Sequence, residues 1–297
     1  MIPALHGVIP AVPTPLDADG NPDPQKLVSF IRELFNAGCH GVNLLGTTGE
    51  ATSFARAARL QVMEAVAKAG LASRMMVGTG AAAFDEAVDL SRAADSMGFA
   101  GALLLPPFYY KDIGEAALAN FVERLANQSR LQTTRIYLYN IPQFTGLRYT
   151  LAMLERLSVS LGEMLAGIKD SSGELAYAED VATNLGQLTV FPSNEATLRD
   201  RQAKCFAGCV SASVNVYPGL ACDVFDRGAN VDAALYTSMV AVRKALSSMP
   251  LVPAVKAAVG WRQKDDTWAA TKEPLAPLTA IQTASLIASL ELAVGSR

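Results

Sequence analysis

The chain has 297 residues, of which 51% are hydrophobic and 18% are charged, a composition that provides a large apolar core and excludes a disordered chain. The formal net charge is −3 and the lysines and arginines are scattered, so no basic stripe for nucleic acid is present. No apolar run approaches the ~18 residues that span a bilayer, and the first residues lack a signal-peptide pattern. We therefore expect a cytoplasmic protein that binds neither nucleic acid nor membranes.

Strand patterns and helix patterns alternate along the chain. We expect strands at residues 7–15, 42–45, 74–78, 101–105, 136–139, 164–168, 188–191 and 209–211. Helical periodicity follows the first seven at residues 24–37, 54–69, 84–97, 115–128, 151–157, 174–184 and 195–204. Eight such strands with crossover helices most simply close as a parallel (β/α)8 barrel, the TIM barrel. No glycine-rich dinucleotide fingerprint follows the first strand, which disfavours a Rossmann fold.

Three further apolar helical stretches follow the last strand, at residues 231–246, 252–259 and 278–292. No linker-like segment separates them from the barrel. We therefore expect a barrel over residues 1–228 and a C-terminal helical extension over residues 229–297 that packs on it.

Lys169 lies directly after the apolar run at residues 164–168 and before a group of turn-forming residues. Taken alone, a lysine at a strand end is most often a solvated residue. An amine in a dry, apolar place loses part of its preference for the charged form, and a neutral amine can attack a ketone to form an imine. In a barrel of this type, functional residues gather at the carboxyl ends of the strands, where Lys169 is placed.

Two other strand ends carry groups that suit the same chemistry. Gly46 and Gly49 flank Thr47 and Thr48, so that amides and hydroxyls can point at one anion such as a carboxylate. An ordinary turn in which a threonine caps the helix is the alternative.

Tyr139 ends the strand that precedes the Lys169 strand, so its phenol can shuttle protons near the amine. A tyrosine that packs at the barrel end and binds a loop is the alternative. Together, a carboxylate site, a phenol and an amine are what a class I aldolase needs for a 2-oxo acid, without any cofactor. With only two histidines, and four cysteines that form no CxxC pair, we expect no metal site.

Three segments resemble the signatures of the dihydrodipicolinate synthase / N-acetylneuraminate lyase family. They are Gly-Thr-Thr-Gly-Glu at 46–50, Tyr-Asn-Ile-Pro at 139–142 and Gly-Ile-Lys-Asp at 167–170, and the resemblance spans essentially the whole chain. It implies Lys169 as the Schiff-base nucleophile, Tyr139 as the proton relay, and Thr47 and Thr48 as donors to the substrate carboxylate. It also implies a homotetramer built as a dimer of dimers.

The resemblance places further residues at the site. Tyr109, or Tyr110 if the register differs by one, matches a tyrosine that reaches into the neighbouring subunit's site; a surface or interface tyrosine is the alternative. Ser171 occupies a hydroxyl position two residues after the lysine. Val210 and Ser211 resemble the segment that lines the pyruvyl pocket.

Phe144 and the pair Asn194 and Glu195 bear on the substrate. Members of the family that condense pyruvate with aspartate semialdehyde carry an arginine where this chain has Phe144, which cannot pair with a carboxylate. Asn194 and Glu195 are candidates to bind a polyhydroxylated tail, although they also suit a helix start. We expect aldol cleavage or dehydration of a 2-keto-3-deoxy sugar acid. The alternatives are 4-hydroxy-tetrahydrodipicolinate synthase, N-acetylneuraminate lyase and a regulatory barrel that binds a 2-oxo acid without turnover.

Overall fold

The computed structural model describes residues 4–295 of the chain, and these contain eight strands. Their bounds are β1 Gly7–Pro10, β2 Val42–Leu44, β3 Met75–Gly78, β4 Gly101–Leu104, β5 Arg135–Asn140, β6 Leu165–Asp170, β7 Thr189–Pro192 and β8 Gly208–Ser211. All pair in parallel, with β2 to β7 in one sheet and β1 beside β8.

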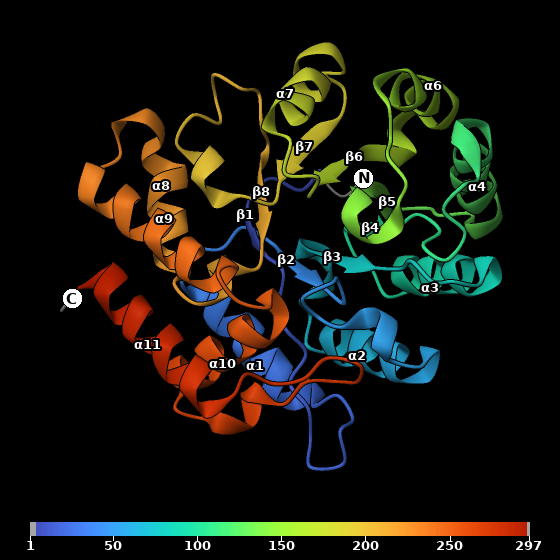
Figure 1. The fold of residues 1–297 in the computed structure, drawn as a ribbon. Helices are drawn as coiled ribbons and strands as arrows, with labels where there is room; N and C mark the ends of the chain where they lie inside the picture. The colour runs from blue at the N-terminus through green and yellow to red at the C-terminus, as the bar shows by residue number, and fades with distance from the viewer. Residues whose placement is uncertain (1–3, 296–297) are drawn as a thin grey trace.

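Two backbone connections close this sheet into a ring. Ala11, just after β1, bridges to Asn43 of β2 in parallel. On the other side, the Ala207 N–H donates to the Val190 carbonyl at 3.1 Å, which joins the start of β8 to β7. The strands thus form the closed parallel barrel that the alternation of patterns predicts, surrounded by helices (Figure 1).

Apart from the short α5, the helices around the barrel bury apolar side chains. Their bounds are α1 Pro24–Asn36, α2 Arg56–Lys68, α3 Phe84–Ser96, α4 Gly114–Ser129, the short α5 Pro142–Thr145, α6 Leu151–Leu161, α7 Leu175–Asn184 and α8 Pro218–Arg227. In α1, Leu27, Phe30, Ile31 and Leu34 are buried at the spacing of one helix face. Each such side chain stabilises the fold by about 1.5–3 kcal/mol. Asp23 caps the same helix by accepting the Lys26 N–H at 3.0 Å.

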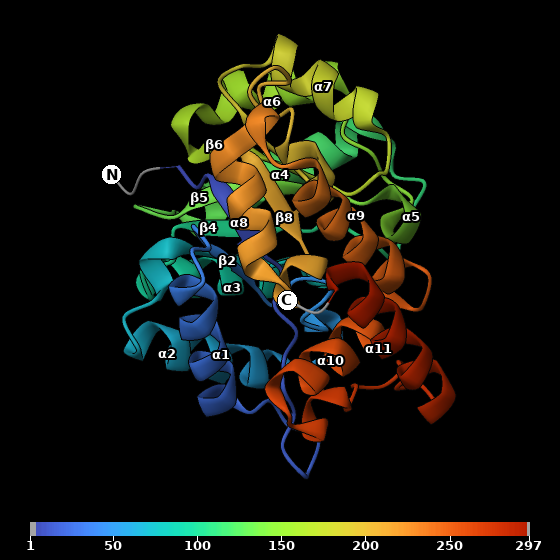
Figure 2. The same cartoon turned by 90° about the vertical axis from the view of Figure 1, so that its left-hand side faces the viewer.

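Three helices follow the barrel, α9 Ala233–Ser247, α10 Leu251–Gln263 and α11 Ala280–Val294. Figure 2 shows them in orange and red beside α8 and α1. An ion pair of 2.8 Å between Lys26 of α1 and Asp265 ties this part to the barrel. The division of the chain at residue 228 stays a prediction. Within residues 4–295, no helix has the length and apolarity needed to cross a membrane.

Three expected elements differ from the structure. Residues 195–204 form a 3₁₀ turn at Glu195–Leu198 followed by turns, not an α-helix, because the charged residues after Leu198 supply no apolar stripe. The first strand ends at Pro10 instead of continuing to residue 15, since the prolines of this segment have no N–H for the ladder. Helix α8, which begins with Pro218 in its first turn, was not expected from the helical periodicity.

Candidate active site

Lys169 and Tyr139 face each other on neighbouring strands. They are register partners in β6 and β5, and the Lys169 side chain is only 4% exposed. Its Nζ lies 4.2 Å from the centroid of the Tyr139 ring. Directly beyond them, the Asn140 side-chain amide donates to the Asp170 carboxylate at 2.7 Å. This buried bond holds the two strand ends together and so fixes the amine beside the phenol.

The loop at 46–49 carries Thr47 to the same phenol. Leu45 and Glu50, which bracket this loop, have left-handed backbones with φ of 51° and 55°. Non-glycine residues in this conformation cost about 1–3 kcal/mol each and persist only where the surroundings enforce them. Thr48 is buried, whereas Thr47 is exposed and its hydroxyl oxygen lies 3.1 Å from that of Tyr139. The strained loop therefore presents one threonine to Tyr139.

The charge and hydrogen bonds around Tyr139 change its acidity. Burial by itself raises the pKa of the phenol. The positive charge of Lys169 and hydrogen bonds with Thr47, Ser171 and Lys169 outweigh burial, so that the pKa of Tyr139 lies below its ordinary value. A phenol that gives up its proton more easily is suited to proton transfer.

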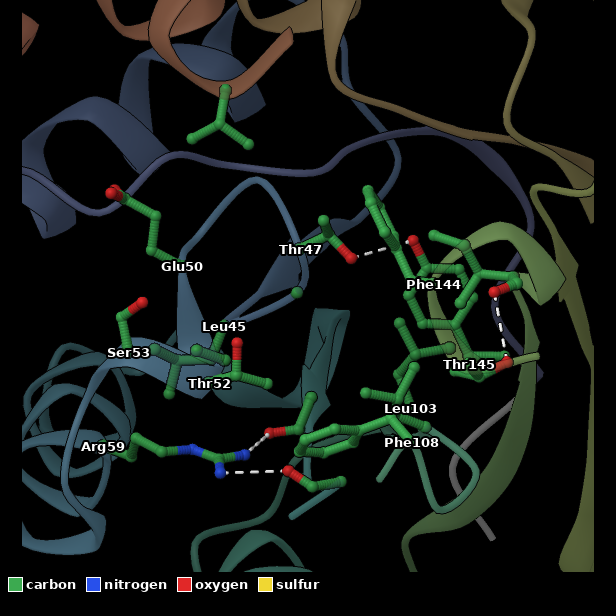
Figure 3. Close-up of a pocket in the computed structure, with 18 of the residues that line it drawn as sticks. Leu45, Thr47, Glu50, Thr52, Ser53, Arg59, Leu103, Phe108, Phe144 and Thr145 are labelled. Atoms are coloured by element: carbon green, nitrogen blue, oxygen red, sulfur yellow. Dashed lines mark hydrogen bonds between the residues drawn. The ribbon is translucent and has the colours of Figure 1, made fainter. Parts of the chain in front are cut away.

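A pocket of about 320 Å³ opens beside these groups. Thr47, Tyr139 and Phe144 line it together with Phe108 of the loop after β4. Figure 3 shows the side chains of Thr47, Phe108 and Phe144 around the hollow. Lys169 packs against the Tyr139 ring and so lies next to this wall of the pocket. Part of the wall comes from the C-terminal segment: Val252, Pro274 and Leu275.

Arg59 in α2 lines the same pocket but was not singled out from the sequence. Its side chain is 2% exposed and donates to the carbonyls of Gly80 at 3.0 Å and Gly78 at 2.8 Å, as Figure 3 shows. Burial lowers the pKa of Arg59 to about 10. The sequence signal was available, because Arg59 lies on the apolar face of α2 with Val62 and Met63, where a lone charge requires partners.

The ends of β7 and β8 hold a separate polar network. The Glu195 carboxylate is buried and accepts from Ser211 at 2.7 Å, from Ser213 and from Arg243 at 2.8 Å. Asn194 accepts the Ala196 N–H at 3.0 Å and caps the 3₁₀ turn. Both Glu195 oxygens and the Ser211 hydroxyl are thus bound to protein groups. Within the described residues, Asn194 acts as the turn start that was the alternative to a substrate role.

The other predicted residues lie in several places. Phe144 is 62% exposed at the pocket rim. Tyr109 is 77% exposed, and the centroid of its ring lies 5.2 Å from that of the Tyr110 ring. Ser171 donates its N–H to the Asn140 carbonyl at 2.8 Å next to Lys169. The remaining two, Gly46 of the pocket wall and Val210 of β8, are buried.

Taken together, the ends of β2, β5 and β6 bring a threonine hydroxyl, a phenol and an amine into one chain of contacts. Such a chain can move a proton from one group to the next while the amine forms a covalent bond. Among residues 4–295, no group of three or more His, Cys, Asp and Glu side chains is arranged to hold a metal ion. The roles of the individual residues stay predictions.

Several known proteins are similar to this chain in sequence and in fold. The model of the dihydrodipicolinate synthetase family matches residues 4–293. A DapA-like lyase of Chloroflexus aurantiacus is 34% identical over 96% of both chains. A 4-hydroxy-tetrahydrodipicolinate synthase of Syntrophotalea carbinolica is 30% identical over 72% of this chain and 71% of its own.

One solved structure, of the prophage protein YagE of E. coli K12 in complex with pyruvate, superposes with a TM-score of 0.88. It is 25% identical and covers 97% of this chain and 98% of its own. YagE itself belongs to the dihydrodipicolinic acid synthase family. On the family match over residues 4–293, the protein described here belongs to the dihydrodipicolinate synthetase family of lyases.

Proposed function

We propose that this protein is an imine-forming lyase that acts on a 2-oxo acid, a 2-keto-3-deoxy sugar acid in the leading case, by aldol cleavage or dehydration. The observation that carries the proposal is the buried Lys169 amine, 4.2 Å from the ring centroid of Tyr139, whose hydroxyl lies 3.1 Å from that of Thr47. The pyruvate complex of the related YagE structure supports a small 2-oxo acid as the ligand.

Each group has one task in the proposed reaction. Lys169 attacks the C2 ketone of the substrate as the neutral amine. The Tyr139 phenol gives its proton to the departing oxygen, one water leaves, and a protonated imine and the Tyr139 phenolate remain. The electrons of the C3–C4 bond then flow into this imine as the C4 hydroxyl gives its proton to the Tyr139 phenolate, so an aldehyde leaves and an enamine remains. Proton return to C3 and addition of water release pyruvate and restore the amine. Thr47 and Thr48 hold the substrate carboxylate during these steps.

We place the far end of the substrate at the part of the pocket wall that includes Phe144. Arg59 lines the same pocket, but its guanidinium is bound to the carbonyls of Gly78 and Gly80. Phe144 at the rim offers no positive charge to an anionic tail. Thr52 and Ser53 line the same pocket and have hydroxyls that suit a polyhydroxylated chain. This combination supports a neutral sugar-like tail rather than a second carboxylate.

The second candidate is 4-hydroxy-tetrahydrodipicolinate synthase. It is favoured by the Syntrophotalea carbinolica relative of that name, which is 30% identical. The same imine chemistry would then join pyruvate to aspartate semialdehyde. The two candidates need different residues at position 144. The second substrate of the synthase carries a carboxylate, which requires a positive charge there, whereas a neutral sugar tail is compatible with Phe144.

Borohydride reduction in the presence of pyruvate tests the shared chemistry. We expect a covalent adduct on Lys169, located by peptide mass spectrometry, in wild-type protein and none in Lys169→Met. A folded wild-type protein without modification at Lys169 would refute the proposal. It would leave the regulatory barrel, which binds a 2-oxo acid without turnover.

A panel of 2-keto-3-deoxy sugar acids, N-acetylneuraminate and aspartate semialdehyde with pyruvate then separates the candidates. We expect pyruvate release from a 2-keto-3-deoxy acid, or its dehydration, with the highest kcat/KM. The highest kcat/KM with aspartate semialdehyde would instead establish the synthase and overturn the argument from Phe144.

A further inference from the structure

A buried ion pair lies outside the three reactive groups. Lys256 of α10 and Glu50 are both 0% exposed at their side chains, and Lys256 Nζ lies 2.5 Å from Glu50 Oε2. The other carboxylate oxygen, Oε1, accepts the Lys272 backbone N–H at 2.6 Å. Residues from the C-terminal segment thus bind both oxygens of a carboxylate that belongs to the barrel.

Glu50 is the last residue of the loop at 46–50, and its backbone is hydrogen-bonded within that loop. Its N–H donates to the Thr47 carbonyl at 3.0 Å, and its left-handed φ of 55° directs the chain into the next turn. From the other side, the Thr14 hydroxyl donates to the Gly49 carbonyl at 2.8 Å. A displacement of the Glu50 backbone therefore also moves Thr47, which is hydrogen-bonded to it and whose hydroxyl contacts that of Tyr139.

The sequence around Lys256 points to a specific purpose for the pair. Lys256 is a single charge in the apolar run at residues 251–259, and a buried charge is tolerated only when it is paired. A hydrophobic residue of similar volume would pack there without the cost of removing a charge from water. The pair joins positions 206 residues apart, and it does so next to the pocket wall formed by Val252, Pro274 and Leu275.

From these contacts we infer that Glu50 and Lys256 are positioning residues, through which the C-terminal segment holds the Thr47–Thr48 loop in the geometry that binds the carboxylate of the 2-oxo acid. The inference rests on the proposed function for the identity of the ligand. Neither residue contacts the reacting atoms in this scheme. The extension is then part of the binding site and not only a cover for the barrel.

The test uses Lys256→Met, the double variant Glu50→Gln with Lys256→Met, and a matched control, Lys26→Met. The control removes another lysine that binds the C-terminal part, at Asp265 and Thr267 instead of at Glu50. Lys256→Met leaves a buried carboxylate without its cation, so its Tm should fall. The double variant removes both charges and keeps an acceptor for the Lys272 N–H, so it should recover part of that Tm.

The readout is the pyruvate concentration that gives half-maximal borohydride trapping at Lys169. We expect it to rise by roughly tenfold or more in both Lys256 variants, because a displaced loop binds the carboxylate poorly. The trapped fraction at saturating pyruvate and the behaviour of Lys26→Met should match the wild type. A double variant that regains wild-type trapping together with its Tm would overturn the inference, since the pair would then be merely structural.

Hydrogen exchange at residues 46–53 separates this inference from the proposed function. The amide of Glu50 should exchange roughly tenfold faster in both Lys256 variants, while amides of β5 and β6 keep their rates. Wild-type exchange rates at Glu50 would refute the positioning role whatever the chemistry. Absence of any adduct in the wild-type protein would refute the proposed function, and the exchange rates would still decide the role of the pair.

Discussion

The two sides of the barrel mouth use their polar residues differently. At the ends of β2, β5 and β6, Thr47, Tyr139 and Lys169 contact one another beside a pocket and retain groups that can react. At the ends of β7 and β8, Glu195 is bound by Ser211, Ser213 and Arg243. Buried polar groups that satisfy each other hold a structure, whereas groups placed beside a pocket remain available to a ligand. The predictions below test this difference.

The largest effect is expected for Lys169→Met. Without the amine no imine can form, so lyase activity should fall by about 10⁴-fold or more. The fold should remain, because methionine fills the buried space without a charge. Steady-state kinetics and circular dichroism measure the two quantities. Substantial activity in this variant would place the chemistry elsewhere.

Tyr139→Phe should remove the proton relay and keep the packing of the ring. We expect kcat to fall by about 10²–10⁴-fold, the usual contribution of general acid–base catalysis. Thr47→Val, which removes the partner of the Tyr139 hydroxyl, is the matched comparison and should lower kcat less. If kcat of Tyr139→Phe stays within about threefold of wild type, the phenol has no part in proton transfer.

On the other side of the mouth, Glu195→Ala should act on stability. It removes the carboxylate that accepts from Arg243, Ser211 and Ser213, although Arg243 keeps the Ser193 carbonyl as an acceptor. Since Arg243 is also partly exposed, the free energy of unfolding should fall by about 2–4 kcal/mol. Urea unfolding measures this, with the charge-only change Glu195→Gln as control. Unchanged stability combined with a raised KM for the sugar acid would show that Glu195 binds substrate instead.

Asn194→Ala should have a smaller effect of the same kind. The loss of the cap on the 3₁₀ turn should reduce the free energy of unfolding by about 1 kcal/mol. Asn194→Asp retains the capping oxygen and should match the wild type in urea. A change in the order of preferred substrates in Asn194→Ala, without loss of stability, would favour the substrate role predicted from the sequence.

The smallest change concerns charge alone. Burial raises the pKa of Tyr139, but the charge of Lys169 and the hydrogen bonds more than compensate, so the phenol should ionise below its ordinary pH range near 10. Removing that charge in Lys169→Met should move the ionisation to higher pH. Ultraviolet difference absorbance of tyrosinate, with Tyr139→Phe as the reference, detects it. If the Tyr139 ionisation moved to lower pH in Lys169→Met, the charge of Lys169 would not be what lowers the pKa of Tyr139.

Several of these features follow from local sequence. The alternation of strand and helix patterns predicted the barrel, because period-2 and period-3.6 spacing depend only on nearby residues. The positions of Thr47, Tyr139 and Lys169 at strand ends followed from the same patterns, since all parallel strands end on one face of a barrel. The expected helix at residues 195–204 was wrong, because the charged residues after Leu198 supply no apolar stripe and the turn that Asn194 caps ends at Leu198.

Sequence alone therefore determined the barrel, the order of its strands and the residues that meet at its mouth. Only the tertiary structure decided which of those residues lie beside the pocket and which belong to the network around Glu195. The predicted substrate role of Glu195 stays a prediction, and the structure adds that Arg243, 48 positions later, pairs with it. Glu50 and Lys256 meet across 206 residues. Such pairs form because distant segments pack together, and the spacing of residues within one segment cannot predict them.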